Sequence, residues 1–367
     1  MAAFQRTANY ALLTPAPPDG SYHNNTTLAN ASQEEVPLLK QGPAMVATLC
    51  LAYGTVVLLA VINNSLVITV IYRNQQMKNV TNYFIANLAT ADLTVALVVL
   101  PITLLSNLYT EWHFGLFLCK AVPYLQGVAV SASVNTQAAV AVERYLVIFY
   151  PKRNIIGPKT AFVIIAVIWL VPLVIMTPWL LTYNLKDFSN PQASLTVCLP
   201  TWDPQKPGLR KGFFLGAVFL TCYFIPLLVI VVFYSMIGIK VWKRSVSGIR
   251  GSQTEKNIHR HKIRIVRMLV VVAVLFALSW IPLYIIRLRM LFGDKLDTRS
   301  SKMMRIYIIP VAQWLGSANC CVNPFIYCYF SELFRKYMTQ LLHGIICMEK
   351  PSAACVSGRK PKNITML

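Results

Sequence analysis

The chain has 367 residues, of which 56% are hydrophobic and 13% charged, and its mean hydropathy is +0.54. Soluble globular proteins carry about 25% charged residues, so the composition excludes a soluble enzyme or binding domain and indicates an integral membrane protein. Membrane topology and anionic lipid headgroups account for the formal net charge of +21 without a nucleic-acid partner.

Seven apolar segments are long enough to span a membrane, since a helix of about 20 residues crosses a hydrocarbon core of about 30 Å. An odd number of crossings places the two ends on opposite sides. We therefore predict an all-α membrane protein, a seven-transmembrane helix bundle over residues 44–329, between an N-terminal segment (1–43) and a tail (330–367). The segments are Ala44–Ile71, Tyr83–Leu105, Cys119–Tyr150, Ala161–Leu181, Phe213–Val241, Ile265–Leu291 and Ile306–Tyr329.

The basic residues predict the orientation, because cytosolic loops carry an excess of Lys and Arg. The segment Lys240–Arg267 and the tail from Phe330 are rich in these residues. We expect the tail in the cytosol and the N-terminus outside the plasma membrane. The exterior N-terminal segment then presents three matches to the glycan acceptor pattern, at Asn24, Asn25 and Asn30.

Two features of the cytosolic tail point to membrane and protein contacts. Cys347, beside Ile345 and Ile346, is a candidate for palmitoylation, which would anchor the tail to membrane lipids. The terminal residues 365–367 fit the pattern of a PDZ ligand.

Cys119 and Cys198 are the two cysteines predicted on the oxidising side of the membrane. Cys119 begins the third predicted helix, and Cys198 lies in the loop between the fourth and fifth. With no other exterior cysteine available, we predict a disulfide between them that fixes the loop across the bundle.

Proline residues inside the predicted helices indicate kinks, because proline removes a backbone hydrogen bond and clashes with the preceding turn. Pro282 follows Trp280 and places a large ring at such a hinge, where a ligand that presses on the ring would change the bend. The alternative is that the kink only gives the helix its shape. The prolines concerned are Pro172, Pro178, Pro226, Pro282, Pro310 and Pro324.

Charged residues within the predicted spans indicate a function, since one charge at the centre of a spanning helix costs about 2.5 to 3.5 kcal/mol. Arg144 lies between two apolar stretches, and Asp92 lies in the middle of the second helix. Asp92 needs partners or an ion, and its oxygen-bearing neighbours would suit Na⁺; a protonated, hydrogen-bonded Asp92 without an ion is the alternative. The expected partners are Ser133, Asn319 and Asn323.

The chain carries a series of motifs in the order found in one membrane protein family. From about Ala44 to Cys347 it resembles a rhodopsin-family G-protein-coupled receptor. The motifs are Asn64-Ser65-Leu66-Val67, the run ending at Asp92, Trp112-His113-Phe114-Gly115, Cys119, Glu143-Arg144-Tyr145, Trp169, Pro226 with Tyr234, Trp280-Ile281-Pro282 and Asn323-Pro324-Phe325-Ile326-Tyr327.

The resemblance implies a role for each of these motifs. Arg144 would engage a heterotrimeric G-protein after an outward movement of helix six, with Tyr234 and Tyr327 holding the open state. Arrestin would be a further intracellular partner, and no cofactor would be needed beyond an allosteric sodium ion at the Asp92 site. Phe330–Leu342 would form a short amphipathic eighth helix. Signal coupling would involve Glu143, Phe276, Trp280, Pro282, Asn323 and Pro324, with Pro226 and Val134 beside Phe276 and Trp280.

One departure concerns the cytosolic end of helix six. The run His259-Arg260-His261-Lys262-Ile263-Arg264 contains no acid that could pair with Arg144. An ionic lock between the two helices is therefore in doubt, and Glu143 is the remaining nearby partner of Arg144.

The absence of two residues from the predicted helices argues against two classes of ligand. Gln126 stands where amine receptors of the family carry an aspartate, and the seventh helix has no lysine for retinal. Asn79–Ile85 and Cys119–Gln126 look most like orexin and RFamide-type neuropeptide receptors, which favours a peptide. The residues expected to contact it are Thr103, Gln126, Tyr284, Arg287 and Gln313.

RFamide-type receptors offer acidic side chains to a ligand arginine, whereas the tops of helices six and seven here are mainly basic. This pattern favours a ligand with an acidic segment; alternatively the basic side chains only reach lipid headgroups or pair locally. The alternative to a peptide is a non-peptide ligand, either acidic or a lipid. Six basic residues face two acids: Arg287, Arg289, Lys295, Arg299, Lys302 and Arg305, against Asp294 and Asp297.

Two other classes of protein are less well supported. A transporter or channel would use its intramembrane charges to move an ion, but the inverted repeats typical of transporters are not visible. An enzyme would need a convergent set of nucleophile, base and metal ligands, which the sequence does not offer.

Overall fold

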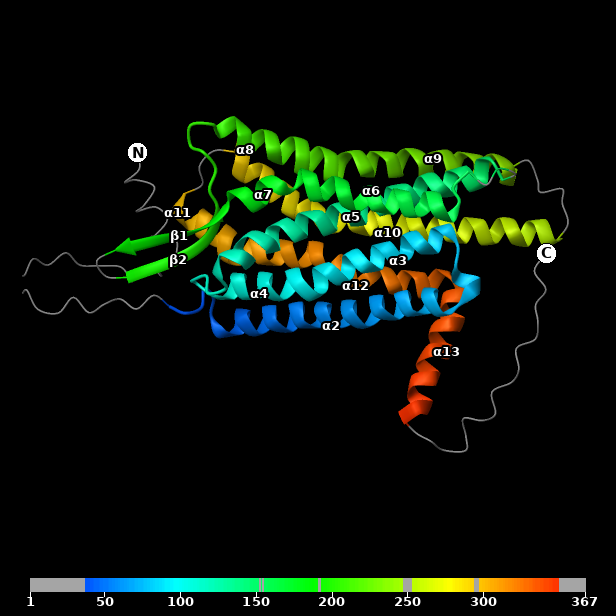
Figure 1. Ribbon diagram of the computed structural model, residues 1–367, viewed down its shortest axis with the longest axis horizontal. Coiled ribbons are helices and arrows are strands. Elements are labelled where there is room, and N and C mark those ends of the chain that lie inside the picture. Colours follow the sequence, from blue (N-terminus) through cyan, green and yellow to red (C-terminus); the bar gives the residue numbers. More distant parts are fainter. Residues whose placement is uncertain are drawn as a thin grey trace, which may run out of the picture.

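The computed structural model describes residues 37–151, 153, 155–190, 193–246, 253–293 and 297–349. Its helices lie side by side in one elongated bundle, from which α13 (Glu332–Glu349) departs at an angle (Figure 1). The predicted glycan acceptors and the PDZ-like terminus lie outside the described residues, as does the side chain of Cys347 within α13.

Seven helical units form the bundle, each overlapping one predicted span. Most are divided into consecutive segments, and η2, η3 and η4 are π-helical. The units are α2 (Pro43–Arg73); α3 (Val80–Thr94), η2 (Val95–Val99) and α4 (Leu100–Leu108); α5 (Gly115–Phe149); α6 (Pro158–Ile175) and α7 (Thr177–Thr182); α8 (Pro207–Phe213), η3 (Phe214–Phe224) and α9 (Ile225–Val246); α10 (Gln253–Phe292); and α11 (Thr298–Met303), η4 (Met304–Ile308) and α12 (Ile309–Phe330).

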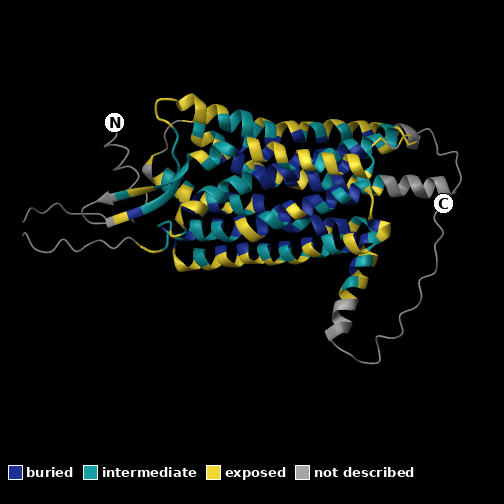
Figure 2. Ribbon diagram, viewed as in Figure 1, coloured by how far each residue is buried: buried dark blue, intermediate teal, exposed yellow. Residues whose placement is uncertain are grey.

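Six helices of the described residues are long and apolar enough to cross a membrane. The remaining unit ends in α12, whose polar side chains, including Gln313, Asn319 and Asn323, lower its hydropathy. Figure 2 shows exposed residues along the outer helix faces and buried residues toward the middle of the bundle. Outward side chains such as Leu51, Val174 and Val231 are large, apolar and exposed, as expected of a surface that faces lipid.

The three π-helical segments share one cause. Each ends two residues before a proline: η2 before Pro101, η3 before Pro226 and η4 before Pro310. Because proline cannot donate a backbone hydrogen bond and its ring crowds the preceding turn, a wider turn relieves the clash. The predicted kinks at Pro226 and Pro310 are therefore accompanied by widened turns.

The helices are joined by polar contacts as well as by packing, as expected where lipid removes the hydrophobic drive between helices. Asn64 of α2 donates from Nδ2 to the carbonyl oxygen of Cys320 in α12 at 2.8 Å. Tyr53 of α2 donates its hydroxyl to the carbonyl oxygen of Pro310 at 2.9 Å. These bonds fix the first helix against the seventh.

A β-hairpin that the sequence analysis did not predict covers one end of the bundle. Strands β1 (Tyr183–Asn190) and β2 (Ala193–Pro200) pair antiparallel, with Leu185 opposite Cys198. The predicted disulfide between Cys119 and Cys198 is present and joins β2 to α5. The backbone N–H of Trp112 also donates to the carbonyl oxygen of Thr196 at 2.8 Å. The hairpin is thus fixed at the start of the third helix.

Candidate ligand cavity and signalling network

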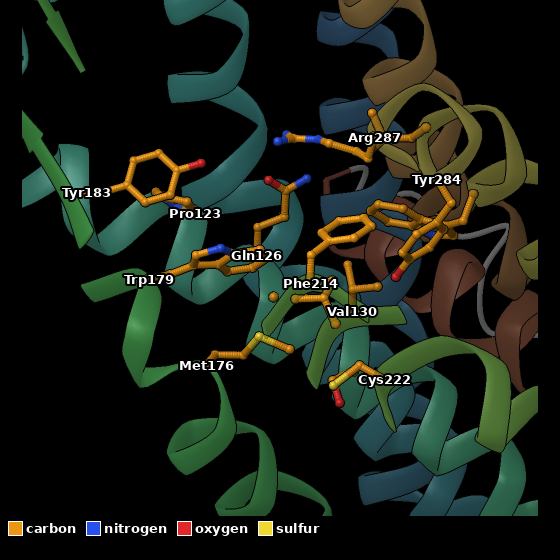
Figure 3. A pocket seen from close by; sticks show the side chains of 15 residues that line it. Pro123, Gln126, Val130, Met176, Trp179, Tyr183, Phe214, Cys222, Tyr284 and Arg287 are labelled. Carbon is orange, nitrogen blue, oxygen red and sulfur yellow. The ribbon is translucent and has the colours of Figure 1, made fainter. Parts of the chain in front are cut away.

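A cavity opens among α5, α7, η3 and α10, near the hairpin end of the bundle. It encloses about 640 Å³, including its open mouth. In Figure 3 the guanidinium of Arg287 and the amide of Gln126 point toward one another across this space. We call it the main cavity; its lining includes Gln126, Gly127, Trp179, Tyr183, Phe214, Trp280, Tyr284 and Arg287.

Aromatic rings lie on more than one wall of the main cavity. The ring centroids of Tyr284 and Tyr223 lie 4.3 Å apart, and Tyr223 donates its hydroxyl to the carbonyl oxygen of Ala277 at 2.9 Å. On the opposite wall, Gly127 lets Trp179 approach the backbone of α5. A Cβ atom at this position would lie 2.4 Å from the Trp179 ring. The absent side chain is therefore what makes room for the Trp179 ring.

Trp280 lies deeper in the cavity than Arg287. Seven residues separate them along α10, which corresponds to about 10 Å of helix. The Trp280 ring rests against Gly316 of α12, where a Cβ atom would lie 3.2 Å from it, and its centroid is 6.3 Å from that of Phe276. Pro282 lies inside α10 two residues later. A molecule in the cavity thus reaches the ring predicted at the hinge.

The five predicted ligand contacts divide into two groups. Gln126, Tyr284 and Arg287 line the main cavity together, whereas Thr103 and Gln313 do not. Thr103 is buried on α4. Gln313 accepts a hydrogen bond from Asn107 Nδ2 at 3.0 Å, and Asn107 also donates to the Tyr53 hydroxyl at 3.3 Å. Asn107 therefore links the side chain of Gln313 to α2.

The residues expected to hold sodium come from three helices: Asp92 from α3, Ser133 from α5, and Asn319 and Asn323 from α12. Asp92, Ser133, Asn319 and Asn323 are all buried. Asn323 donates from Nδ2 to Asp92 Oδ2 at 2.8 Å, while its Oδ1 atom is buried without a hydrogen-bond partner. An unpartnered carbonyl oxygen beside a carboxylate suits a cation, so these residues fit the predicted ion.

Arg144 is held by two neighbours at the other end of α5. Its Nη2 atom donates to Glu143 Oε1 at 2.7 Å and also to the hydroxyl of Thr81 on α3. Thr81 in turn donates to Glu143 Oε2 at 3.2 Å. As expected from the sequence of helix six, Glu143 is the acid that pairs with Arg144.

The basic foot of α10 instead pairs with the start of α13. Arg264 forms an ion pair with Glu332, and both side chains are about half exposed or more, at 51% and 69%. This contact joins the sixth helix to the segment after the seventh. Sequence reasoning missed it because the two residues lie 68 positions apart.

Two buried polar clusters were also missed. Asn87 donates from Nδ2 to Thr136 Oγ1 at 2.7 Å and accepts a hydrogen bond from Trp169 Nε1 at 2.8 Å, which joins three helices. Gln137 lines a small cavity with Tyr234 and Tyr327, and both polar atoms of its side chain are buried without a partner. The signal available in the sequence was an amide side chain within a predicted membrane span.

Comparison with known proteins identifies the family. The model of the family described as 7 transmembrane receptor (rhodopsin family) matches residues 63–327, which is more than half of the chain. The chain belongs to this family. The predicted resemblance is thereby confirmed, as is the seven-helix bundle, and the family is one of receptors and not of enzymes.

The receptor is similar to several peptide receptors. Neuropeptide FF receptor 2 of Rattus norvegicus is 35% identical over 305 residues, which cover 80% of this chain and 72% of that receptor. The QRFP-like peptide receptor of Branchiostoma floridae is 33% identical over 296 residues, covering 79% and 76%. The pyroglutamylated RF-amide peptide receptor of Rattus norvegicus is 33% identical over 329 residues, covering 85% and 73%.

Proposed function

We propose that this receptor binds an extracellular peptide in the main cavity and activates heterotrimeric G-proteins at the opposite end of the bundle. The observation that carries the proposal is the position of Trp280, which lines the cavity, rests on Gly316 of the seventh helix and lies two residues before Pro282 in α10. A ligand that displaces this ring changes the contact between helices six and seven. The similar receptors named above are themselves peptide receptors.

The proposed output is an outward movement of helix six that frees Arg144. In the structure the guanidinium of Arg144 donates hydrogen bonds to Glu143 and Thr81. Tyr234 and Tyr327 line one small cavity beside the same helices and are placed to fill the space that opens. This arrangement supports a resting state that the ligand converts to an active one.

The proposal includes the orientation and the ion. With the N-terminus outside, the main cavity opens to the exterior, and the basic foot of α10 and the tail face the cytosol, in line with the excess of Lys and Arg there. Asp92, Ser133, Asn319 and Asn323 would hold a sodium ion that favours the resting state, because their oxygen atoms supply ligands in a buried site. Arrestin and a PDZ protein belong to the same proposal.

The test is nucleotide exchange on added G-protein by the receptor reconstituted in membranes, screened against a neuropeptide library. We expect a peptide that accelerates exchange in the wild type and not in Arg144→Leu, while both forms bind the peptide. Ion flux across the same membranes should stay at background. Ligand-stimulated exchange that persists in well-expressed Arg144→Leu would contradict the proposal, and a peptide-dependent flux would favour a channel.

A further inference from the structure

A second cavity of about 490 Å³, including its open mouth, lies beside the main cavity and shares Trp179, Tyr183, Phe214 and Arg287 with it. The two are therefore neighbouring compartments of one ligand site, separated by these side chains. We call the second compartment the arginine annex. Its further lining includes Pro200, Trp202, Arg210, Phe213 and Met290.

The arginine annex combines two guanidinium groups with no carboxylate. Arg210 comes from α8 and Arg287 from α10, and none of the described residues that line either cavity is acidic. Among the residues that the structure describes, neither arginine lies within ion-pair distance of an Asp or Glu side chain. Arg305 on η4 adds a third positive charge, which repels that of Arg210. Like charges gathered beside apolar walls favour an anion between them.

The walls of the arginine annex are suited to a flat ring. The centroid of Phe213 lies 5.5 Å from that of Trp202 and 5.9 Å from that of Trp179. These distances are typical of aromatic packing, in which an additional ring gains contact with several faces and edges. The compartment therefore offers an aromatic surface directly beside its cations.

We infer that the arginine annex receives an acidic residue of the peptide ligand together with a neighbouring aromatic side chain, the carboxylate on Arg210 and Arg287 and the ring against Trp202 and Phe213. This inference rests on the proposed function and names the ligand chemistry of the same site. Arginine suits the role because its planar guanidinium binds a carboxylate through two parallel hydrogen bonds. The arginine of a peptide ending in Arg-Phe-amide would instead meet two like charges.

The inference can be tested with three matched probes, acetylated dipeptide amides in which phenylalanine is preceded by glutamate, glutamine or arginine. Dissociation constants come from the rise in melting temperature of the purified full-length receptor with probe concentration. We expect the glutamate probe to bind about tenfold more tightly than the glutamine probe, since charge-assisted hydrogen bonds are the stronger kind. The arginine probe should bind most weakly.

Substitutions then locate the effect. Arg210→Gln and Arg287→Gln should each reduce the preference for glutamate, the double variant should abolish it, and Arg287→Lys should retain part of it. Lys211→Gln is the matched control, because Lys211 follows Arg210 on α8 but lies over the Phe292 ring, 5.1 Å from its centroid, and lines neither cavity. It should leave the preference unchanged.

Three results would overturn the inference: equal affinity for the glutamate and glutamine probes, tightest binding of the arginine probe, or a preference for glutamate that survives in the double variant. The readout does not depend on signalling. If the glutamate probe binds in a way that requires Arg210 and Arg287 but no peptide stimulates nucleotide exchange, the proposed function is refuted and the inference stands. If a peptide stimulates exchange and substitution of both arginines does not change its effect, the inference is refuted and the proposed function stands.

Discussion

Gln137 presents an energetic cost at the scale of a single residue. Its amide is buried, and neither its oxygen nor its nitrogen has a hydrogen-bond partner. An unsatisfied buried polar group costs about 1 to 3 kcal/mol. The cavity that holds it is also lined by Tyr234 and Tyr327, whose hydroxyls are potential partners once the helices move. The unpaired amide therefore raises the free energy of the resting arrangement relative to one in which the amide is hydrogen-bonded.

We therefore expect Gln137→Leu to raise the melting temperature and to lower ligand-free nucleotide exchange about fivefold, because a favourable change of about 1 kcal/mol is a factor of about five. Gln137→Met, which is more flexible, should act in the same direction and controls for overpacking by the branched side chain. Unchanged or faster ligand-free exchange in both variants would refute the explanation.

Gly316 controls the resting position of Trp280. A methyl group at this glycine would lie 3.2 Å from two ring atoms, closer than ordinary contact, so the ring must shift by a few tenths of an ångström. Gly316→Ala should therefore destabilise the resting state and raise ligand-free exchange about fivefold, in line with the about 1 to 3 kcal/mol cost of overpacking. Gly54→Ala is the control, since nothing lies within 4 Å of its new Cβ atom. The same exchange rate in both variants would contradict the prediction.

The ion pair between α10 and α13 acts at the scale of helices. Because both side chains are largely exposed, its contribution is limited to about 0.2 to 1 kcal/mol. Breaking it with Arg264→Glu should raise ligand-free exchange by at most about fivefold, since α10 is then freer to move. The double variant Arg264→Glu with Glu332→Arg should restore the original rate. Failure of the swap to restore it would show that the pair does not restrain α10.

Lys40 provides a pH-dependent contact for the segment that precedes α2. Its ammonium donates to the carbonyl oxygen of Ser106 at 2.7 Å, and burial lowers the pKa of Lys40 from 10.5 to about 8. The unfolded chain therefore binds more protons than the folded one between these pH values, so stability rises with pH across this window. The melting temperature of the wild type relative to Lys40→Met should increase from pH 8 to pH 10.

Lys206→Met is the control for this pH dependence, because Lys206 is an exposed lysine just before α8. Its melting temperature should run parallel to that of the wild type over the same range. A parallel course for Lys40→Met as well would show that burial does not affect the Lys40 ammonium in the way inferred here.

The helices were predictable from the sequence, whereas their internal geometry was not. A run of about 20 apolar residues has few alternatives to a spanning helix, and proline marks where that helix is perturbed. Whether an α-helix continues through the proline, as α10 does at Pro282, or forms a widened turn, as before Pro226, depends on the packing of neighbouring helices. The hairpin escaped notice because Leu195–Leu199 is short, although its alternation with Thr196 is a strand pattern.

The hydrogen bonding of Asp92 and Arg144 within the bundle could be expected for a different reason, which is that the cost of burying a charge leaves few explanations for a charged residue within a span. The ligand contacts were harder to place. Thr103 and Gln313 have suitable chemistry but do not line the main cavity, and Arg210 was not singled out because it lies in an exposed loop region of the sequence. Side-chain direction and the path of the hairpin decide these positions, and neither can be read from residue type.

At the scale of the whole molecule, the proposed ligand site and the proposed G-protein site lie far apart. Gln126 and Arg144 lie 18 residues apart on α5, which corresponds to about 27 Å of helix. Of the residues expected to hold sodium, Ser133 lies between these two on α5, and a hydrogen bond joins Asp92 of α3 to Asn323 of α12. An ion bound there stabilises whichever arrangement of these helices supplies its ligands. Sodium would thus act on the bundle as a unit.

Replacing potassium by sodium at constant ionic strength should therefore raise the melting temperature and lower ligand-free exchange. A ligand present at 100 times its dissociation constant stabilises the state that binds it by about 2.7 kcal/mol. Asp92→Asn keeps the side chain nearly isosteric but removes the charge, so both effects should disappear. Ser133→Ala should weaken them, because one oxygen ligand is lost while the carboxylate remains. Equal melting temperatures in the two salts for the wild type would mean that Asn323 alone satisfies Asp92, which returns the site to the hydrogen-bonded alternative without an ion.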